Sequence, residues 1–122
     1  MDGKMKISLS EKETGYVLQL NSNVLTVEWI FCLKNLMKTL LESKSVALDL
    51  QNVECICAEF LEFLKETSIQ RKISLINLQS ELFVLLNLTE SDKFTHIFLN
   101  EIDYLEQKRA LINRKFTLLD CA

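Results

Sequence analysis

VALDLQNVECICAEFLEFL, residues 46–64, is the stretch of this sequence that decides its fold. Its first five residues are mostly apolar, as in a strand buried on both faces of a parallel sheet. A helix is predicted from Ala58 to Ser68, with Phe60, Leu61 and Leu64 on its inward side, because these residues recur at helical spacing. The turn between them lies at the carboxyl end of a strand, where α/β proteins place their ligand sites.

Strands and helices alternate on both sides of this stretch. Lys4 to Ser10 alternates polar and apolar residues, and Tyr16 to Asn21 follows a short polar turn, which predicts a hairpin. The other predicted elements are a helix over Thr26–Glu42, a strand over Val46–Leu50, a strand over Ile73–Leu78, a helix over Glu81–Leu88 capped by Ser80, a strand over His96–Leu99 and a final helix capped by Asn100. The order β-β-α-β-α-β-α-β-α predicts an α/β fold with a mainly parallel sheet, an antiparallel N-terminal edge hairpin and about four helices.

Apolar residues form a wide stripe on the helix predicted from Thr26 to Glu42. The stripe consists of Trp29, Leu33, Leu36, Met37 and Leu40, widened near its start by Val27, Ile30 and Phe31. Deep packing on the sheet is the preferred interpretation. The alternative is that part of the stripe is exposed and binds a partner. On the final helix, the inward positions are expected to be Ile102, Leu105, Ile112 and Phe116.

Composition limits the classes of protein that this chain can represent. Its 122 residues, 48% hydrophobic and 25% charged, can fill one core, so a single domain over residues 1–122 is expected. The net charge of −3 argues against nucleic-acid binding. We find no signal-peptide core and no apolar run long enough to span a bilayer. Four irregularly spaced cysteines favour the reducing cytoplasm.

No residue pattern points to an enzyme. His96 has no matching nucleophile signature, and two glycines cannot build a glycine-rich phosphate loop. No cofactor is therefore expected. Cys55 and Cys57 form the only close cysteine pair, and an extended backbone would turn both thiols to one side. Two ligands are few for a zinc site, so small buried side chains are the preferred interpretation. A thiol or metal-binding protein is the alternative.

Two segments in this order resemble the STAS domain of the anti-sigma factor antagonists. VALDLQNVECICAEFLEFL is similar to the family's strand, turn and helix opening on Asp-Ser-Ser/Thr-Gly-Leu. LNLTESDKFTHIF, residues 86–98, is similar to the leucine-rich third helix and the Leu-Thr-Gly-Leu-Asp-Lys run before the last strand. The resemblance covers nearly the whole chain. It implies a non-enzymatic regulator whose partner is an anti-sigma factor or a serine-kinase-type protein.

The chain departs from the family at the regulatory position. Asp-Ser-Ser-Gly aligns with Cys57, Ala58, Glu59 and Phe60, so the phosphoacceptor falls on Glu59. Phosphorylation at that residue is therefore excluded. A carboxylate at a helix start could imitate a phosphoserine, with a charge of −1 against about −2. The alternative is that Glu59 only complements the helix dipole, an effect of about 0.3–1 kcal/mol.

The resemblance also implies a contact surface. Its expected residues are the turn Asn21, Ser22 and Asn23, the junction Cys57, Ala58, Glu59 and Phe60, and Glu62 and Lys65 on the following helix. The family's acidic turn aligns with Ser22 to Leu25, where its acidic residues are missing. A second use of the same fold is as the regulatory subunit of a membrane transporter's ATPase.

Overall fold

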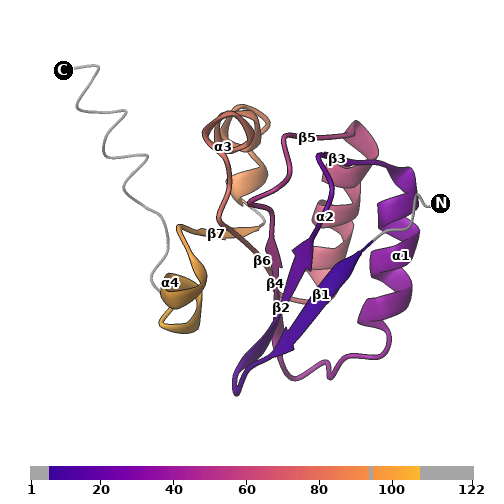
Figure 1. Ribbon diagram of the computed structural model, residues 1–122, viewed down its shortest axis with the longest axis vertical. Helices are drawn as coiled ribbons and strands as arrows, with labels where there is room; N and C mark the ends of the chain where they lie inside the picture. Colours follow the sequence, from indigo (N-terminus) through magenta and orange to yellow (C-terminus); the bar gives the residue numbers. More distant parts are fainter. Residues whose placement is uncertain (1–5, 94, 108–122) are drawn as a thin grey trace.

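A computed structural model of the protein describes residues 6–93 and 95–107 and contains a five-stranded sheet (Figure 1). The strand order is β1-β2-β4-β6-β7. These strands are β1 (Ile7–Glu11), β2 (Gly15–Leu20), β4 (Ser45–Asp49), β6 (Ile73–Ile76) and β7 (His96–Phe98). β1 and β2 form an antiparallel hairpin, and the other pairs are parallel. The predicted α/β fold with its mainly parallel sheet and edge hairpin is confirmed.

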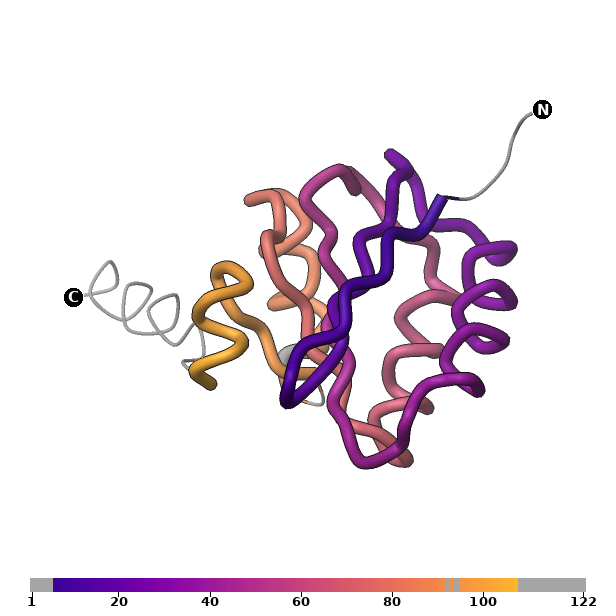
Figure 2. The backbone as a smooth tube through the Cα atoms, turned by 60° about the horizontal axis from the view of Figure 1, so that its bottom comes forward, coloured from indigo at the N-terminus to yellow at the C-terminus, as the bar shows by residue number. Residues whose placement is uncertain are grey.

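The four α-helices of the described residues are α1 (Val27–Met37), α2 (Ala58–Gln70), α3 (Ser80–Leu88) and α4 (Glu101–Leu105). A 3₁₀ turn, η1 (Ser91–Lys93), follows α3. α1 and α2 lie side by side on one face of the sheet, and α4 lies across the sheet from them (Figures 1 and 2). The main core joins the sheet to α1, α2 and α3, and a smaller cluster beneath α4 contains Val17, Ala47, Ile76, Phe98 and Tyr104.

β4 is the central strand because its sequence suits burial on both faces. Val46, Ala47 and Leu48 are completely buried, and they alternate between the two core clusters. A strand with no polar side chain at these positions can only be covered by helices on both sides. The stretch that decides the fold therefore occupies the middle of the sheet.

Several predicted boundaries were wrong. β6 ends at Ile76 rather than Leu78, and α2 ends at Gln70 rather than Ser68. α1 ends at Met37 rather than Glu42. Beyond Met37 the backbone tightens, and the N–H groups of Thr39 and Leu40 donate to the carbonyls of Leu36 and Met37. Ser80 is the first residue of α3, not its cap; the capping position belongs to Gln79, whose side chain makes no capping bond.

Two strands were not predicted: β3 (Val24–Leu25) and β5 (Cys55–Ile56), which pair with each other in a separate two-stranded parallel sheet. Two residues are too few to produce an alternating pattern in the sequence. These strands add to the predicted order without changing it.

α4 is capped as predicted, since the Asn100 side chain accepts a hydrogen bond of 2.8 Å from the Asp103 backbone N–H. Its predicted inward face was wrong. Ile102 is 65% exposed and Leu105 37%, whereas Tyr104 is buried against the sheet. The other two positions of that predicted stripe, Ile112 and Phe116, lie outside the described residues.

Tyr104 fixes α4 to the sheet through its hydroxyl. Its Oη lies 2.6 Å from the Ser45 Oγ and donates to the Tyr16 carbonyl at 3.4 Å. Its ring meets that of Phe98 edge-on, with centroids 5.6 Å apart. Gly15 lies directly beneath the hydroxyl, because a Cβ at that position would be only 2.2 Å from the Tyr104 Oη.

Burial raises the pKa of Tyr104 above its ordinary value of 10.0, partly offset by the Ser45 hydrogen bond and the charge of Arg71. The folded protein therefore favours the neutral phenol. This contribution to stability is complete below pH 10.0 and is lost as the pH rises through the higher folded-state pKa. We expect the stability of wild type to fall more steeply in this alkaline range than that of Tyr104→Phe. Urea denaturation at stepped pH measures the difference, and parallel curves for the two proteins would contradict it.

Candidate functional site

The candidate site lies at the carboxyl edge of the parallel strands, where the loops after β2 and β4 meet. The Asn23 carbonyl accepts hydrogen bonds from the backbone N–H groups of Glu54 at 2.7 Å and Cys55 at 3.2 Å. The Leu25 carbonyl accepts one from the Cys57 N–H at 3.1 Å. The β3–β5 ladder between these loops pairs Val24 with Cys55 and Leu25 with Ile56. The turn at Asn21–Asn23 and the start of α2, far apart in sequence, thus lie on one surface.

Side-chain amides connect the same loops. The Asn52 Nδ2 donates to the Asn21 Oδ1 at 3.1 Å, which joins the loops after β4 and β2. The Gln79 Nε2 donates to the Gln51 carbonyl at 2.9 Å, which joins the loops after β6 and β4. Within the loop after β4, the Gln51 N–H donates to the Asp49 carboxylate at 3.1 Å. Three successive loops at this edge are therefore held together.

Glu59 lies in the first turn of α2 and is exposed. The residue before the helix, Cys57, has an extended backbone and makes no side-chain capping bond. The first turn of a helix presents backbone N–H groups without intrahelical acceptors and a partial positive charge. A carboxylate at Glu59 is electrostatically favoured there, as a phosphate would be.

Most predicted site residues reach the surface of the described structure. Asn21, Asn23, Ala58, Glu59, Glu62 and Lys65 are exposed, whereas Ser22 and Cys57 are half-buried. On α2, the spacing of Ala58, Glu62 and Lys65 places them on one stripe. The Ser22 Oγ is occupied locally, since it donates to the Val24 carbonyl at 2.8 Å.

Phe60 is a correction to the predicted contact surface. Its side chain is completely buried in the main core and packs edge-on against Phe63, with ring centroids 5.4 Å apart. It aligns with a family glycine, so the sequence comparison placed it at the surface. As a large aromatic residue on the inner side of α2, it belongs to the core instead.

The start of α1 was missing from the predicted site. α1 begins beside α2, because the Cys57 N–H bonds to Leu25 just before the α1 cap, Thr26. Glu28 in its first turn accepts a hydrogen bond of 2.6 Å from the Thr26 hydroxyl, which lowers the pKa of the Glu28 carboxyl. Two adjacent helix starts therefore each carry a glutamate, Glu28 and Glu59.

The apolar stripe predicted on α1 divides into a buried and an exposed part. Trp29, Ile30, Leu33, Met37 and Leu40 are buried. Phe31 is 64% exposed and Val27 42% exposed. Both sequence interpretations are thus partly right about burial: the helix packs deeply on the sheet, and one edge of the stripe faces solvent. Whether that edge binds a partner stays a prediction.

The cysteine pair is open to solvent. Cys55 is exposed, Cys57 and Cys32 are half-buried, and all three are free thiols. The preferred sequence interpretation, small buried side chains, was therefore wrong for Cys55. Within residues 6–93 and 95–107, no group of three or more His, Cys, Asp or Glu side chains could hold a metal ion.

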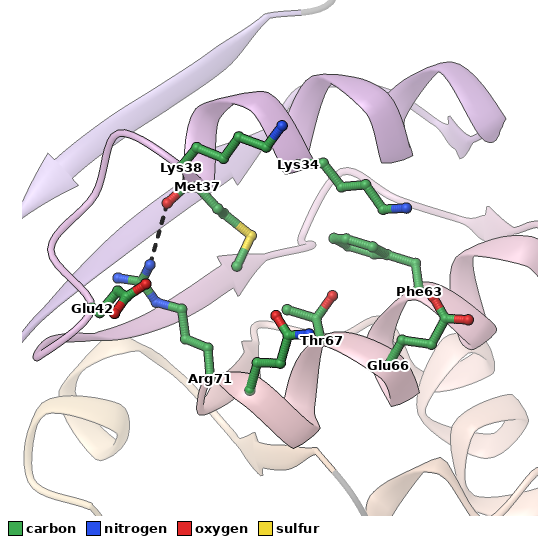
Figure 3. Close-up of a pocket in the computed structure, with 9 residues that line it drawn as sticks. Lys34, Met37, Lys38, Glu42, Phe63, Glu66, Thr67 and Arg71 are labelled. Carbon is green, nitrogen blue, oxygen red and sulfur yellow. Dashed lines mark hydrogen bonds between the residues drawn. The ribbon is translucent and has the colours of Figure 1, made fainter.

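A groove of about 420 Å³ runs between the later turns of α1 and α2 (Figure 3). Lys34 and Lys38 line it from α1, and Glu66, Thr67 and Gln70 line it from α2. Met37 and Phe63, both nearly buried, form its apolar floor. Arg71 closes one end and donates to the Met37 carbonyl at 3.3 Å.

Solved structures similar to this one show the same architecture. A crystal structure from Thermotoga maritima, provisionally assigned as an anti-sigma factor antagonist, matches with a TM-score of 0.62 and 21% identity, over 83% of this chain and 92% of that one. The chain has a STAS-like fold. An uncharacterized protein from Shewanella loihica with a SpoIIAA-like fold matches this STAS-like domain with a TM-score of 0.58 and 12% identity, over 88% of this chain and 98% of that one.

The sequence comparisons add no relative to this STAS-like fold. No protein-family model matches the sequence, and no curated protein is significantly similar to it. The predicted family resemblance is thus confirmed at the level of the fold. In the described part of the chain, no helix is long and apolar enough to cross a membrane.

Proposed function

We propose that this protein is a non-enzymatic regulator that acts in the cytoplasm by binding another protein, in the manner of an anti-sigma factor antagonist. Its partner is an anti-sigma factor or a related serine-kinase-type protein. The binding surface consists of Asn21–Asn23, Cys57–Glu59, and Glu62 and Lys65 on the outer stripe of α2. The surface extends to Glu28 at the start of α1.

One observation carries this proposal: the carboxyl-edge turn and the start of α2 are hydrogen-bonded into one surface. The bonds from Asn23 to Glu54 and Cys55, and from Leu25 to Cys57, bring together the two segments that the family resemblance implies. The solved structure assigned as an anti-sigma factor antagonist supports the class of partner.

In this proposal, the permanent charge of Glu59 takes the place of the serine or threonine that is switched by phosphorylation in the family. The side chain is exposed in the first turn of α2 and carries no hydroxyl that a kinase could phosphorylate. A permanent negative charge there corresponds to the phosphorylated form of a family member. Glu28, in the adjacent helix start, adds a second carboxylate to the same edge.

Reversing the charge at Glu59 tests the surface. We expect Glu59→Lys to weaken partner binding at least about tenfold, because like charges brought together at an interface cost several kcal/mol. The partner is first recovered from native lysate with the tagged protein and identified by mass spectrometry. Affinities of the purified pair are then measured by isothermal titration calorimetry.

Glu13→Lys is the matched control, since Glu13 is an exposed glutamate in the hairpin turn at the opposite edge of the sheet. It makes the same charge change and is expected to leave the affinity unaltered. Equal effects of the two variants would overturn the proposed surface. Glu59→Ser tests the fixed-charge idea separately, because the variant is expected to become a substrate of a partner kinase or to bind the partner with a different affinity. If the variant is not phosphorylated and its affinity is unchanged, only the helix-dipole role of Glu59 remains.

The transporter-subunit hypothesis and the thiol hypothesis predict different outcomes of the partner recovery and the affinity measurements. Recovery of a transporter ATPase as the specific partner would favour the first. Loss of binding in Cys55→Ser/Cys57→Ser, with Glu59→Lys unaffected, would favour the second.

A further inference from the structure

Along the α1–α2 groove the two sides carry opposite charges, basic on α1 and acidic on α2. At the closed end the order is reversed, with Glu42 after α1 and Arg71 after α2. On α1, Lys34 and Lys38 continue the exposed stripe of Val27 and Phe31, since these residues recur at three- and four-residue spacing. On α2, the side facing α1 carries Glu59, Glu66 and Gln70 at the same kind of spacing. All of these side chains are exposed. Figure 3 shows Lys34 and Lys38 on the α1 side and Glu66 on the α2 side.

None of these charges is neutralised by a close partner in the described structure. The ion pairs found in residues 6–93 and 95–107 involve Lys12, Lys44 and Lys93, and neither Lys34 nor Lys38 is among them. Phe31 adds a large exposed aromatic side chain to the basic side, and aromatic residues are enriched at interface hot spots. The groove therefore presents unpaired charge above an apolar floor, and the exposed ring of Phe31 continues the basic stripe of α1 beyond it.

We propose that this face binds a second copy of the chain, through a two-fold axis that runs along the groove. α1 and α2 are parallel, because each leaves the carboxyl edge of the sheet and returns to the next parallel strand. A two-fold axis parallel to the helices places α1 of one copy against α2 of the other. The lysine side then meets the glutamate side twice, as a closed two-fold interface requires.

The charge pattern excludes the other simple arrangement. An axis across the helices would place α1 against α1 and bring lysines opposite lysines. Like charges brought together at an interface repel each other and weaken binding, whereas opposite charges orient the partner. The inference is independent of the proposed function. It has one consequence for that function, since Glu59 belongs to both surfaces and dimer formation would compete with the regulatory partner.

Sedimentation velocity on the purified full chain tests the dimer. We expect wild type to sediment at twice its chain mass of 14.2 kDa as the concentration rises. Two reversal variants are expected to stay monomeric: Lys34→Glu/Lys38→Glu, which makes both sides acidic, and Glu59→Lys/Glu66→Lys, which makes both sides basic. Each reversal should raise the dissociation constant at least about tenfold.

Mixing the two reversal variants shows whether they are monomeric because their charges no longer match or because they are misfolded. A dimer between one all-acidic and one all-basic copy pairs opposite charges at both contacts, so the equimolar mixture is expected to dimerise. Phe31→Ser should weaken the wild-type dimer without changing its circular dichroism spectrum. A monomeric wild type at every concentration, a dimer that survives both reversals, or a mixture that stays monomeric would each overturn the proposal; the first would leave the groove to a different protein.

Discussion

Replacing Arg71 with methionine is expected to lower the free energy of unfolding by about 3 kcal/mol. The Arg71 guanidinium follows α2 and reaches across to the end of α1. Its Nη1 donates to the Met37 carbonyl at 3.3 Å, and its Nη2 donates to the carbonyls of Leu41 and Lys44, the latter at 3.1 Å. Of these acceptors only Met37 belongs to α1. The Met37 carbonyl also accepts the Leu40 N–H and the Leu41 carbonyl also accepts the Lys44 N–H, so Arg71 adds a second donor to both carbonyls and ties the end of α1 to the following segment.

The size of this effect follows from two opposing contributions. Hydrogen bonds from a charged donor are worth about 1.5–3 kcal/mol each when buried, and those to the partly exposed carbonyls are worth less. The Arg71 Nε is buried without a hydrogen-bond partner in the described structure, so its removal recovers part of the loss. The segment from Leu41 to Lys44 keeps other links to the sheet. The Leu41 N–H donates to the Tyr16 hydroxyl at 3.2 Å, and the Lys44 ammonium donates to the Glu11 carboxylate at 2.7 Å and to the Lys12 carbonyl at 3.0 Å.

Urea denaturation followed by circular dichroism measures the effect. Arg71→Lys is expected to be intermediate, because one ammonium group keeps the charge but cannot span the carbonyls as a planar fork does. Lys65→Met, an exposed change on the same helix, should stay within about 0.5 kcal/mol of wild type. Equal stabilities of Arg71→Met and Lys65→Met would show that these bonds contribute nothing.

The second large effect is expected at Gly15, where Gly15→Ala should cost about 2–3 kcal/mol. The added methyl would lie 2.2 Å from the Tyr104 Oη, 2.7 Å from the Ser45 Oγ and 3.0 Å from the Ser45 carbonyl. Tyr104 is buried between α4 and the sheet, so its ring cannot move aside freely. The clash must separate α4 from β2 and β4.

A double-mutant cycle locates the clash. In Tyr104→Phe the nearest atom is absent, so Gly15→Ala is expected to cost less in that background than in wild type. The difference between the two costs, measured by urea denaturation, is the coupling between Gly15 and the hydroxyl. An unchanged cost in the Tyr104→Phe background would mean that the Ser45 contacts alone set the limit.

The parts of the fold that repeat a pattern could be predicted from the sequence. The alternation in β2, the continuous apolar run of β4 and the helical spacing in α2 each give a distinct signal over several residues. The Asn100 cap of α4 could also be predicted, whereas the cap of α3 could not, because Ser80 and Gln79 differ by a single position and the Gln79 side chain forms no capping bond. β3 and β5 gave no signal, since their two-residue ladder depends on pairing between distant segments.

The part of the candidate site at the junction of β5 and α2 could be predicted from the sequence. The part that depends on α1 lying beside α2 could not. Cys57, Ala58 and Glu59 are contiguous with β5, so the junction identified them. For Phe60 two predictions from the sequence conflicted. Its helical spacing predicted an inward side chain, which is confirmed, and its alignment with a family glycine placed it on the contact surface, which was wrong because that glycine carries no information on where a phenylalanine packs. Lys34 and Glu66 could not be assigned to a groove, because the groove exists only once α1 lies beside α2. Arg71 was invisible because its acceptors are backbone carbonyls, which carry no sequence signature.

The links among the three loops at the carboxyl edge have a consequence for the thermodynamics of recognition. The bonds from Asn52 to Asn21 and from Gln79 to Gln51 restrict these loops when the chain folds. Ordering a free backbone costs about 1–2 kcal/mol of conformational entropy per residue, and in these loops the cost arises during folding rather than during binding. A partner that docks at this edge encounters a preorganised surface, so most of its contact energy remains available as affinity.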